Sequence, residues 1–390
     1  MKKINFGLLP RIIIAIILGI GCGNIFNEPL VRIFVTFNGI FSQFLGFMIP
    51  LIIVGLVTPA ISDIGKGAGK LLAITTLIAY CDTIFAGFLS YGTGVAFFPS
   101  LISTGQHVSN IAQVAGPAAF FTVTIPPLMD VMTALILSFT LGLGIAYLNS
   151  TVMKSMFDEF KDIISGTIRV VIIPLLPIYI FGIFLNMTFT GQVYSVLTVF
   201  IKIIAVIFAL HILLLIFQYC VAAAFVKKNP FRLLGRMLPA YFTALGTSSS
   251  AATIPVTLKS TIKNGVTEGI AGFVIPLCAT IHMAGSSMKI TACALAIMMM
   301  QGMPHSFTLM AGFICMLGIV MVAAPGVPGG CIMAALGILG SILGFNANDQ
   351  ALMIALYIAM DNFGTACNVT GDGAIALVID KFFKKKMQIA

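Results

Sequence analysis

Residues 351–380 read ALMIALYIAMDNFGTACNVTGDGAIALVID, a stretch long and apolar enough to cross a bilayer. An ionisable residue inside such a segment is costly, and it therefore indicates function. The polar residues of the stretch include Asp361, Asn362, Asn368, Thr370 and Asp372. The two aspartates are eleven residues apart, so on a helix they lie near one face and about 16 Å apart along the axis. This separation is sufficient for two distinct sites on one helix.

The rest of the chain has the composition of a membrane protein. Of its 390 residues, 59% are hydrophobic and 8% are charged, whereas soluble domains have about 25% charged residues. The net charge of +9 does not indicate nucleic-acid binding, because the basic residues cluster in short loops beside apolar segments. The sequence has no HExxH, GxSxG or P-loop motif and no paired cysteine spacing. We therefore expect neither an enzyme nor an organic cofactor, and cysteines that simply fill apolar space.

Apolar segments divide the chain into candidate membrane spans. Clear spans lie at residues 7–26, 40–62, 71–97, 125–148, 163–187 and 194–226. Segments 235–264 and 306–345 instead contain two short apolar arms around a polar or Gly/Pro-rich tip, and segment 268–300 is interrupted near His282. Short, interrupted segments at matching places in two halves of a chain are the best sequence indication of a transport site.

The distribution of basic residues predicts the topology. With the N-terminus in the cytoplasm, 17 of the 21 Lys and Arg residues fall on one side. This holds only if segments 235–264 and 306–345 are re-entrant hairpins that enter from opposite faces. We therefore expect an all-α membrane protein with eight transmembrane helices and two opposed hairpins, arranged as inverted repeats. The expected location is the cell inner membrane, with both termini cytoplasmic.

Four motifs in this order resemble the dicarboxylate/amino acid:cation symporter family, which includes the glutamate and neutral amino acid transporters. They are SSAATIP at 249–255, HMAGS at 282–286, GVPG at 326–329 and DNFGTACNVTGD at 361–372. The resemblance covers essentially the whole chain. The Met-Ala-Gly at 283–285 is similar to the bacterial serine/threonine branch of that family.

The resemblance implies a homotrimer in which a scaffold supports a transport domain that moves as an elevator. The scaffold would comprise residues 1–70 and 117–190. The transport domain would comprise spans 71–97, 194–228, 266–300 and 350–384 together with the hairpins 235–264 and 306–345. The family's activity implies secondary active symport, in which Na⁺ entry drives the uptake of a small amino acid. Its other partner would be membrane lipid, with no nucleic acid involved.

The resemblance also assigns binding residues. Asp361 would bind the substrate's α-ammonium group. The other substrate-binding residues would be Ser249, Ser250, Ser286, Val327, Thr365 and Asn368. One Na⁺ would lie among Asp372 and the carbonyl groups of Cys278, His282 and Asn368. A second Na⁺ would lie beneath the second hairpin, near Thr280, Met283, Met321, Val322 and Ala324. Carboxylate and carbonyl oxygens are the hard ligands that Na⁺ prefers.

Three positions depart from the acidic-substrate members of the family. Gly364 stands where those members have an arginine, and Ser248 stands where some keep another. Because an unpaired substrate carboxylate is costly to bury, we expect a small neutral substrate of the serine, threonine or alanine type, with room beside Gly364. Ala284 stands where many members place an aspartate of a third Na⁺ site, although Tyr80 and Thr83 match the rest of that site.

Two basic residues near the interruption carry separate hypotheses. We expect Lys289 to pair with Asp82 and to replace the third Na⁺ by a fixed positive charge, unless it extends to the membrane interface. His282 either lends only its backbone carbonyl to Na⁺ or couples protons (H⁺) through its imidazole. A dicarboxylate or acidic amino acid as substrate, and a channel or sensor on the same fold, remain open alternatives. No role is assigned to Arg169, Lys202 and His211.

Overall fold

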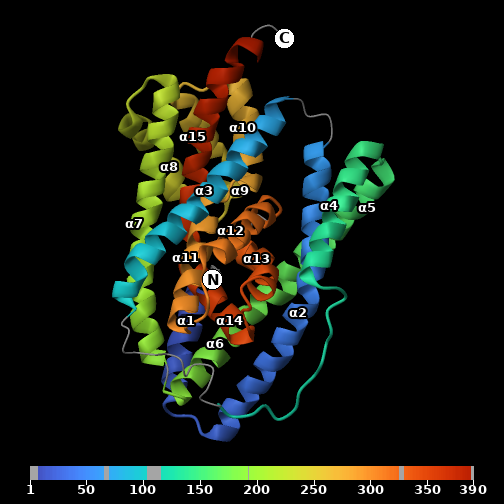
Figure 1. Cartoon of the computed structure of the whole chain (residues 1–390), viewed down its shortest axis with the longest axis vertical. Coiled ribbons are helices and arrows are strands. Elements are labelled where there is room, and N and C mark those ends of the chain that lie inside the picture. The colour runs from blue at the N-terminus through green and yellow to red at the C-terminus, as the bar shows by residue number, and fades with distance from the viewer. Residues whose placement is uncertain (1–7, 66–69, 103–115, 192, 325–328, 388–390) are drawn as a thin grey trace, which may run out of the picture.

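The computed structural model describes residues 8–65, 70–102, 116–191, 193–324 and 329–387 (Figure 1). Within these ranges every regular element is a helix. The helices are α1 (Leu8–Gly23), α2 (Glu28–Gly65), α3 (Lys70–Leu101), α4 (Val131–Leu148), α5 (Thr151–Thr167), α6 (Ile173–Phe189), α7 (Val193–Val226), α8 (Pro230–Thr247), α9 (Ser250–Lys263), α10 (Glu268–Ile281), α11 (Ala284–Met300), α12 (Phe307–Val322), α13 (Gly330–Ser341), α14 (Ala347–Ala359) and α15 (Asp361–Met387). A π-helical turn at Ile168–Ile172 joins α5 to α6.

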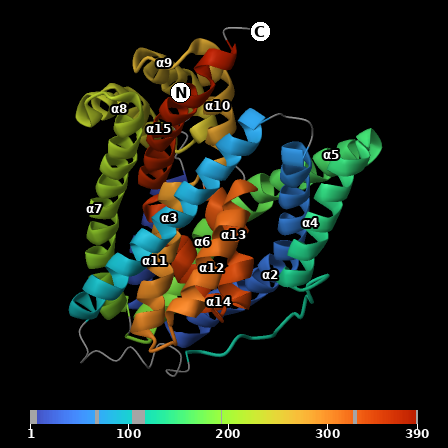
Figure 2. The same cartoon turned by 45° about the horizontal axis from the view of Figure 1, so that its top comes forward.

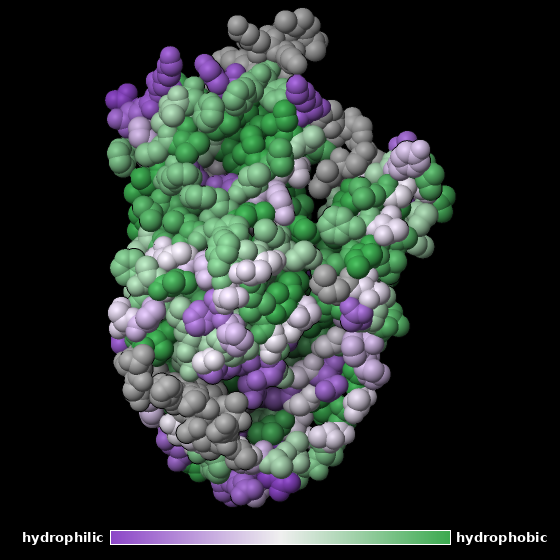
Figure 3. All heavy atoms as spheres, in the orientation of Figure 1, coloured by the Kyte–Doolittle hydropathy of each residue, from purple (hydrophilic) through white to green (hydrophobic). Residues whose placement is uncertain are grey.

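Several helices are suited to a bilayer. By length and composition, five segments in the described part of the chain are able to cross a membrane, namely Glu28–Ser62, Lys70–Leu101, Thr151–Phe189, Val196–Val226 and Glu268–Met300. The pair α14 and α15 qualifies as a sixth, although the two helices are bent by 62°. Shorter apolar helices lie at Pro10–Gly23, Thr133–Leu148, Phe307–Val322 and Gly330–Ser341. On the face in Figure 3, hydrophobic side chains cover much of the middle and hydrophilic ones gather toward both ends.

These observations confirm an all-helical, multi-pass membrane protein. The predicted count of eight spans and the re-entrant placement of the hairpins remain predictions. The expected interruptions are nevertheless present as breaks in helices, because polar and glycine residues stand where the helices end. α8 ends at Thr247 and α9 begins at Ser250, α10 and α11 are separated at His282, and α12 and α13 are separate helices. Each break leaves backbone N–H and C=O groups without helical partners, and these groups are available to side chains or ligands.

The helices fall into two packing groups. In the first group, α2 packs against α4, α5 and α6, and α1 packs against α6. In the second group, α15 contacts α7, α8, α9, α10 and α11, while α3 lies along α11 and α12 (Figures 1 and 2). α13 and α14 contact both groups. The assignment of the first group to a scaffold and of the second to a moving transport domain remains a prediction.

Candidate substrate and cation site

An ion pair joins the first residue of α15 to the middle of α11. The Lys289 Nζ lies 3.1 Å from Asp361 Oδ1, and the other carboxylate oxygen accepts a hydrogen bond from the backbone N–H of Gly329 at 2.8 Å. The Lys289 side chain is fully buried and Asp361 is 5% exposed. The contact with Gly329 connects Asp361 to the start of α13, so the carboxylate links the second hairpin to α11.

The ammonium group of Lys289 has further partners in a buried environment. Its Nζ lies 3.5 Å from the centre of the Tyr357 ring and 3.4 Å from the Met360 carbonyl oxygen. The predicted pairing of Lys289 with Asp82 is therefore wrong. The predicted free space beside Gly364 is also wrong, because a Cβ atom at that position would lie 2.7 Å from Lys289 Nζ. The lysine reaches Gly364 because α11 and α15 are in direct contact there.

A group of neutral polar side chains lies next to this ion pair. Asn368 Oδ1 accepts hydrogen bonds from the backbone N–H groups of Gly285, at 2.8 Å, and Ser286, at 3.3 Å. Its Nδ2 donates to Ser286 Oγ at 3.2 Å, and the Tyr357 hydroxyl donates to the same oxygen at 3.1 Å. These bonds stabilise the start of α11, where N–H groups lack helical partners. Asn368, Ser286 and Tyr357 thus form a buried set of donors and acceptors beside Asp361.

The remaining predicted substrate residues lie close to the hairpin tips. The Ser248 hydroxyl bonds Asn362 Oδ1, which fixes the tip between α8 and α9 on the start of α15. Ser249 caps α9 by accepting from the Ala252 N–H at 3.3 Å, and Ser250 is the first residue of that helix. Thr365 donates to the Asp361 carbonyl at 3.0 Å. Val327 lies outside the described residues.

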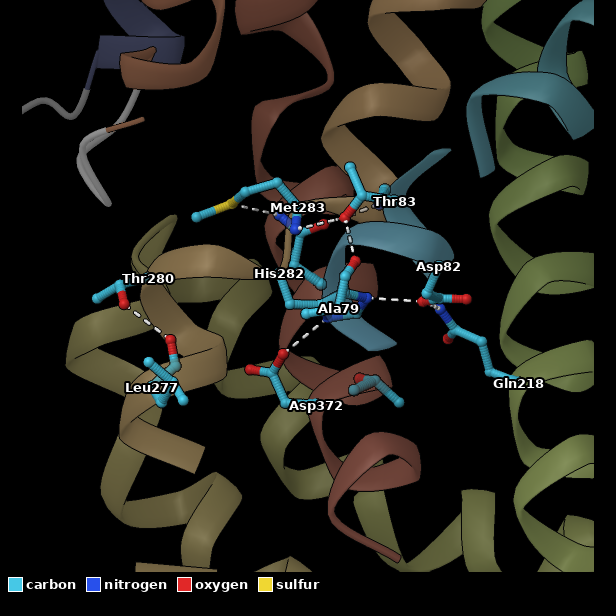
Figure 4. A network of polar contacts seen from close by, with 12 residues as sticks. Ala79, Asp82, Thr83, Gln218, Leu277, Thr280, His282, Met283 and Asp372 are labelled. Atoms are coloured by element: carbon cyan, nitrogen blue, oxygen red, sulfur yellow. Dashed lines mark hydrogen bonds and ion pairs between the residues drawn. The ribbon is translucent and has the colours of Figure 1, made fainter. Parts of the chain in front are cut away.

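Farther along α15, a histidine bridges two aspartates. His282 Nδ1 lies 2.8 Å from Asp372 Oδ1, and His282 Nε2 lies 2.7 Å from Asp82 Oδ2 (Figure 4). Gln218 on α7 donates from Nε2 to the same Asp82 oxygen at 2.6 Å. His282 and Asp372 are each 1% exposed. The triad Asp82–His282–Asp372 therefore ties α3, the α10–α11 break and α15 together.

The proton count of this triad follows from its geometry. An ionised carboxylate can only accept hydrogen bonds, so each of the two nitrogen–oxygen contacts must contain one proton. The three groups then share two protons and carry a net charge of −1, whichever atoms hold them. The imidazole of His282 is thus directly engaged, in addition to any role of its backbone carbonyl.

The contacts of Asp361 with Lys289 and of Asp372 with His282 also define the direction of α10–α11 relative to α15. Asp372 follows Asp361 on α15, whereas its partner His282 precedes Lys289, the partner of Asp361. The segment α10–α11 is therefore antiparallel to α15. This arrangement places Lys289 opposite Asp361 and the imidazole of His282 opposite Asp372.

Comparison with known proteins agrees with these motifs. The model of the sodium:dicarboxylate symporter family matches residues 8–382. The chain belongs to this family. The serine/threonine transporter SstT of Acinetobacter baumannii is 26% identical over 96% of this chain and 97% of its own length. SstT of Acinetobacter baylyi is 25% identical over 98% of each chain. Excitatory amino acid transporter 3 of Mus musculus is 34% identical over 42% of this chain and 31% of its own length.

Membership of the sodium:dicarboxylate symporter family supports transport rather than enzymatic activity. Because the family description includes sodium, the positions of the predicted Na⁺ ligands are relevant. The Cys278 carbonyl accepts the His282 backbone N–H at 2.8 Å, and the Met321 carbonyl accepts the Ala324 N–H at 3.2 Å. Thr280 donates to the Leu277 carbonyl at 2.7 Å (Figure 4). Met283 donates its N–H to Thr83 at 3.4 Å. α10, which carries Thr280, and α12, which carries Met321, contact each other, and Na⁺ binding between them remains a prediction.

Two residues of this symporter site were missed by the sequence reasoning. Gln218 lies within a long apolar span, and a polar amide at membrane depth is a signal that points to a partner. Tyr357 lies four residues before Asp361, and its aromatic ring gave no sign that it would face the ammonium group of Lys289. Both contacts depend on which helices are neighbours, and the spacing of residues along one helix does not contain that information.

Proposed function

We propose that this symporter couples Na⁺ entry to the uptake of a small neutral amino acid of the serine, threonine or alanine type. The observation that carries the proposal is the Asp361–Lys289 ion pair beside the hydroxyl and amide groups of Ser286, Tyr357 and Asn368. The full-length similarity to proteins named serine/threonine transporters supports the same substrate class.

Charge balance favours a neutral solute. The Asp361–Lys289 pair contributes no net charge, and a zwitterionic amino acid adds none either. A second carboxylate on the substrate would have to compete with Asp361 for the lysine, and leaving a buried charge unpaired costs several kcal/mol. The space beside Gly364 is filled by Lys289, which favours a small side chain able to bond Ser286 or Tyr357.

Binding would use groups from both hairpins. The substrate ammonium would lie on the Asp361 carboxylate, which has capacity for further hydrogen bonds. The substrate carboxylate would lie at the start of α9, near Ser249 and Ser250, where helical N–H groups and the helix dipole favour an anion. On this proposal the second packing group moves as an elevator against the first, within a homotrimer of the cell inner membrane with cytoplasmic termini.

A dicarboxylate or acidic amino acid is the second candidate. One observation favours it: the Lys289 ammonium lies at Gly364, where acidic-substrate members place a cation. A substrate carboxylate that displaced Asp361 from the lysine would receive the positive charge that the glycine itself lacks.

One binding experiment separates the two candidates. Purified protein is titrated with serine, threonine, alanine, aspartate and succinate, each with Na⁺ and with choline replacing Na⁺. We expect Na⁺-dependent binding of serine, threonine or alanine and at least ~10-fold weaker binding of aspartate, because a buried uncompensated carboxylate costs more than about 1.4 kcal/mol. Tight binding of aspartate or succinate would replace the first candidate with the second. Concentrative uptake that collapses without a Na⁺ gradient distinguishes a transporter from a channel.

A further inference from the structure

The carboxylate of Asp361 changes its partners during the proposed transport cycle. In the loaded carrier it would bind the ammonium group of the substrate. In the empty carrier that ammonium group is gone, whereas the carboxylate is still inside the protein, where Asp361 is 5% exposed. A buried carboxylate without a counter-charge is strongly destabilising. The empty carrier therefore needs another cation next to Asp361.

Lys289 supplies a cation at this place. Its Nζ lies 3.1 Å from Asp361 Oδ1, and its side chain is fully buried. Among the described residues no other lysine or arginine is buried. The other two aspartates near the centre of the protein, Asp82 and Asp372, are bonded to His282 instead. Because a buried lysine is costly, its placement on this one carboxylate indicates a function.

The position of Lys289 does not depend on Asp361 alone. Its Nζ also lies 3.4 Å from the Met360 carbonyl oxygen and 3.5 Å from the centre of the Tyr357 ring. A carbonyl oxygen and an aromatic face both attract an ammonium group, which has three protons to share among its partners. A Cβ atom at Gly364 would lie 2.7 Å from the same nitrogen, so the glycine leaves the space that the lysine occupies. Lys289 therefore keeps a place beside Asp361 when a substrate ammonium binds the carboxylate.

The other partners of Asp361 do not supply a full counter-charge. Its second carboxylate oxygen accepts the backbone N–H of Gly329 at 2.8 Å. The carboxylate also lies in the first turn of α15, where the helix dipole contributes roughly half a unit of positive charge. Part of the negative charge therefore remains, and only an ammonium group, from Lys289 or from the substrate, neutralises it.

We infer that Lys289 is the counter-ion of Asp361 that allows the empty carrier to return across the membrane with no other cation in the place of the substrate ammonium. This inference rests on the proposed neutral amino acid substrate and on the proposed movement of its site.

Loss of Lys289 should affect the two movements of the carrier unequally. Without the lysine, the Asp361 carboxylate of an empty site would attract water and would have to lose it again to cross the membrane. A loaded site would cross with the substrate ammonium on the same carboxylate. The return of the empty carrier should therefore slow much more than the movement of the loaded carrier.

Two flux measurements in proteoliposomes separate these movements. Net uptake of labelled serine into vesicles that contain no serine requires the return of the empty carrier, whereas exchange into vesicles preloaded with serine and Na⁺ does not. In Lys289→Met we expect the ratio of net uptake to exchange to fall at least ~10-fold below the native ratio. Destabilisation alone lowers both fluxes together and leaves the ratio unchanged. The matched control is Lys202→Met, which removes an exposed lysine bonded to the Leu101 carbonyl and should keep the native ratio.

The native protein provides a second test that requires no substitution. With Lys289 as the counter-ion, net uptake of serine should proceed at the same rate with K⁺ on both sides of the membrane as with choline on both sides, at the same Na⁺ gradient. Choline is too large to take the place of the substrate ammonium, so it does not serve as a substitute counter-ion.

The outcomes are distinct. A smaller fall of the ratio in correctly folded Lys289→Met overturns the inference, and so does native net uptake that requires K⁺ in the vesicles. Either result leaves Na⁺-dependent transport of serine intact. Where Lys289→Met does not fold, the comparison of K⁺ with choline decides. Absence of both Na⁺-dependent net uptake and exchange of any neutral amino acid overturns the proposed function instead, and this inference with it.

Discussion

The Lys289–Asp361 pair makes a quantitative prediction about stability. The substitution Lys289→Met removes the ammonium group and keeps an unbranched apolar side chain of similar length. In the native protein the Nζ lies 3.1 Å from Asp361 Oδ1, and the lysine is fully buried. After the substitution the Asp361 carboxylate keeps its bond to the Gly329 N–H but loses its counter-charge.

The expected cost follows from the burial of the carboxylate that remains. Removing one partner of a buried ion pair costs about 3–5 kcal/mol, because the other charge stays buried without compensation. For a chain of this size such a loss lowers the melting temperature by about 4–6 °C. Asp361→Asn should cost a similar amount, since it leaves the Lys289 ammonium unpaired. The double variant Lys289→Met with Asp361→Asn removes both charges and should recover most of the stability.

Thermal unfolding in detergent measures these differences. The chain has no tryptophan, so a thiol-reactive fluorophore is the better reporter: Cys278, Cys293, Cys331 and Cys367 are buried and become reactive on unfolding. The matched control is Lys202→Met, because that lysine bonds the Leu101 carbonyl, at 3.3 Å, in an exposed position. Its melting temperature should change by less than about 2 °C.

A double-mutant cycle decides whether the reasoning holds. The coupling energy between positions 289 and 361 should exceed about 2 kcal/mol if the ion pair is formed as described. A double variant as unstable as the sum of the two single variants would refute the pairing of Lys289 with Asp361. The double variant should also lose Na⁺-dependent serine binding even though its stability is recovered, because no carboxylate remains for the substrate ammonium.

Three further substitutions test other contacts of the site. Gly371→Ala places a Cβ atom 2.8 Å from His282 Cε1 and should destabilise the protein by about 1–3 kcal/mol in the same unfolding assay; an unchanged melting temperature would contradict the close packing. Tyr357→Phe removes the hydroxyl bonded to Ser286 and should cost about 1 kcal/mol, seen as a several-fold rise in the KM for serine. Asp82→Asn removes the carboxylate that bonds His282 and Gln218 and should destabilise the protein by about 1–3 kcal/mol in the same unfolding assay; an unchanged melting temperature would argue against these contacts.

The sequence predicted where the helices break because each break combines polar or flexible residues within an apolar stretch. The residues from Thr247 to Pro255 include the end of α8 and the start of α9. The polar group after Ile281 likewise marks the boundary between α10 and α11. Helix lengths were less predictable. The second span was expected at 40–62, but α2 begins at Glu28, since polar residues such as Thr36 continue a helix when their hydroxyl bonds the preceding turn.

The partner of Lys289 was not predictable from spacing. His282 lies in the break between α10 and α11, so its spacing of seven residues from Lys289 does not place both side chains on one helical face. The choice among the carboxylates of Asp82, Asp361 and Asp372 depends on the register between α11 and α15. The antiparallel register brings Lys289 to Asp361 and His282 to Asp372. Asp82 on α3 is then bonded by the second ring nitrogen of His282, Nε2, and is not available to the lysine.

The charge compensation by Lys289 and by the protons of the His282 triad also bears on the return of an empty carrier. In the proposed mechanism the empty core must cross the membrane to collect the next substrate. Without compensation, the carboxylates of Asp82, Asp361 and Asp372 would carry three negative charges, and each buried charge costs several kcal/mol. Lys289 and the shared proton of the His282 triad reduce this to a single charge. In the proposed mechanism, this compensation lowers the desolvation energy of the step that resets the carrier.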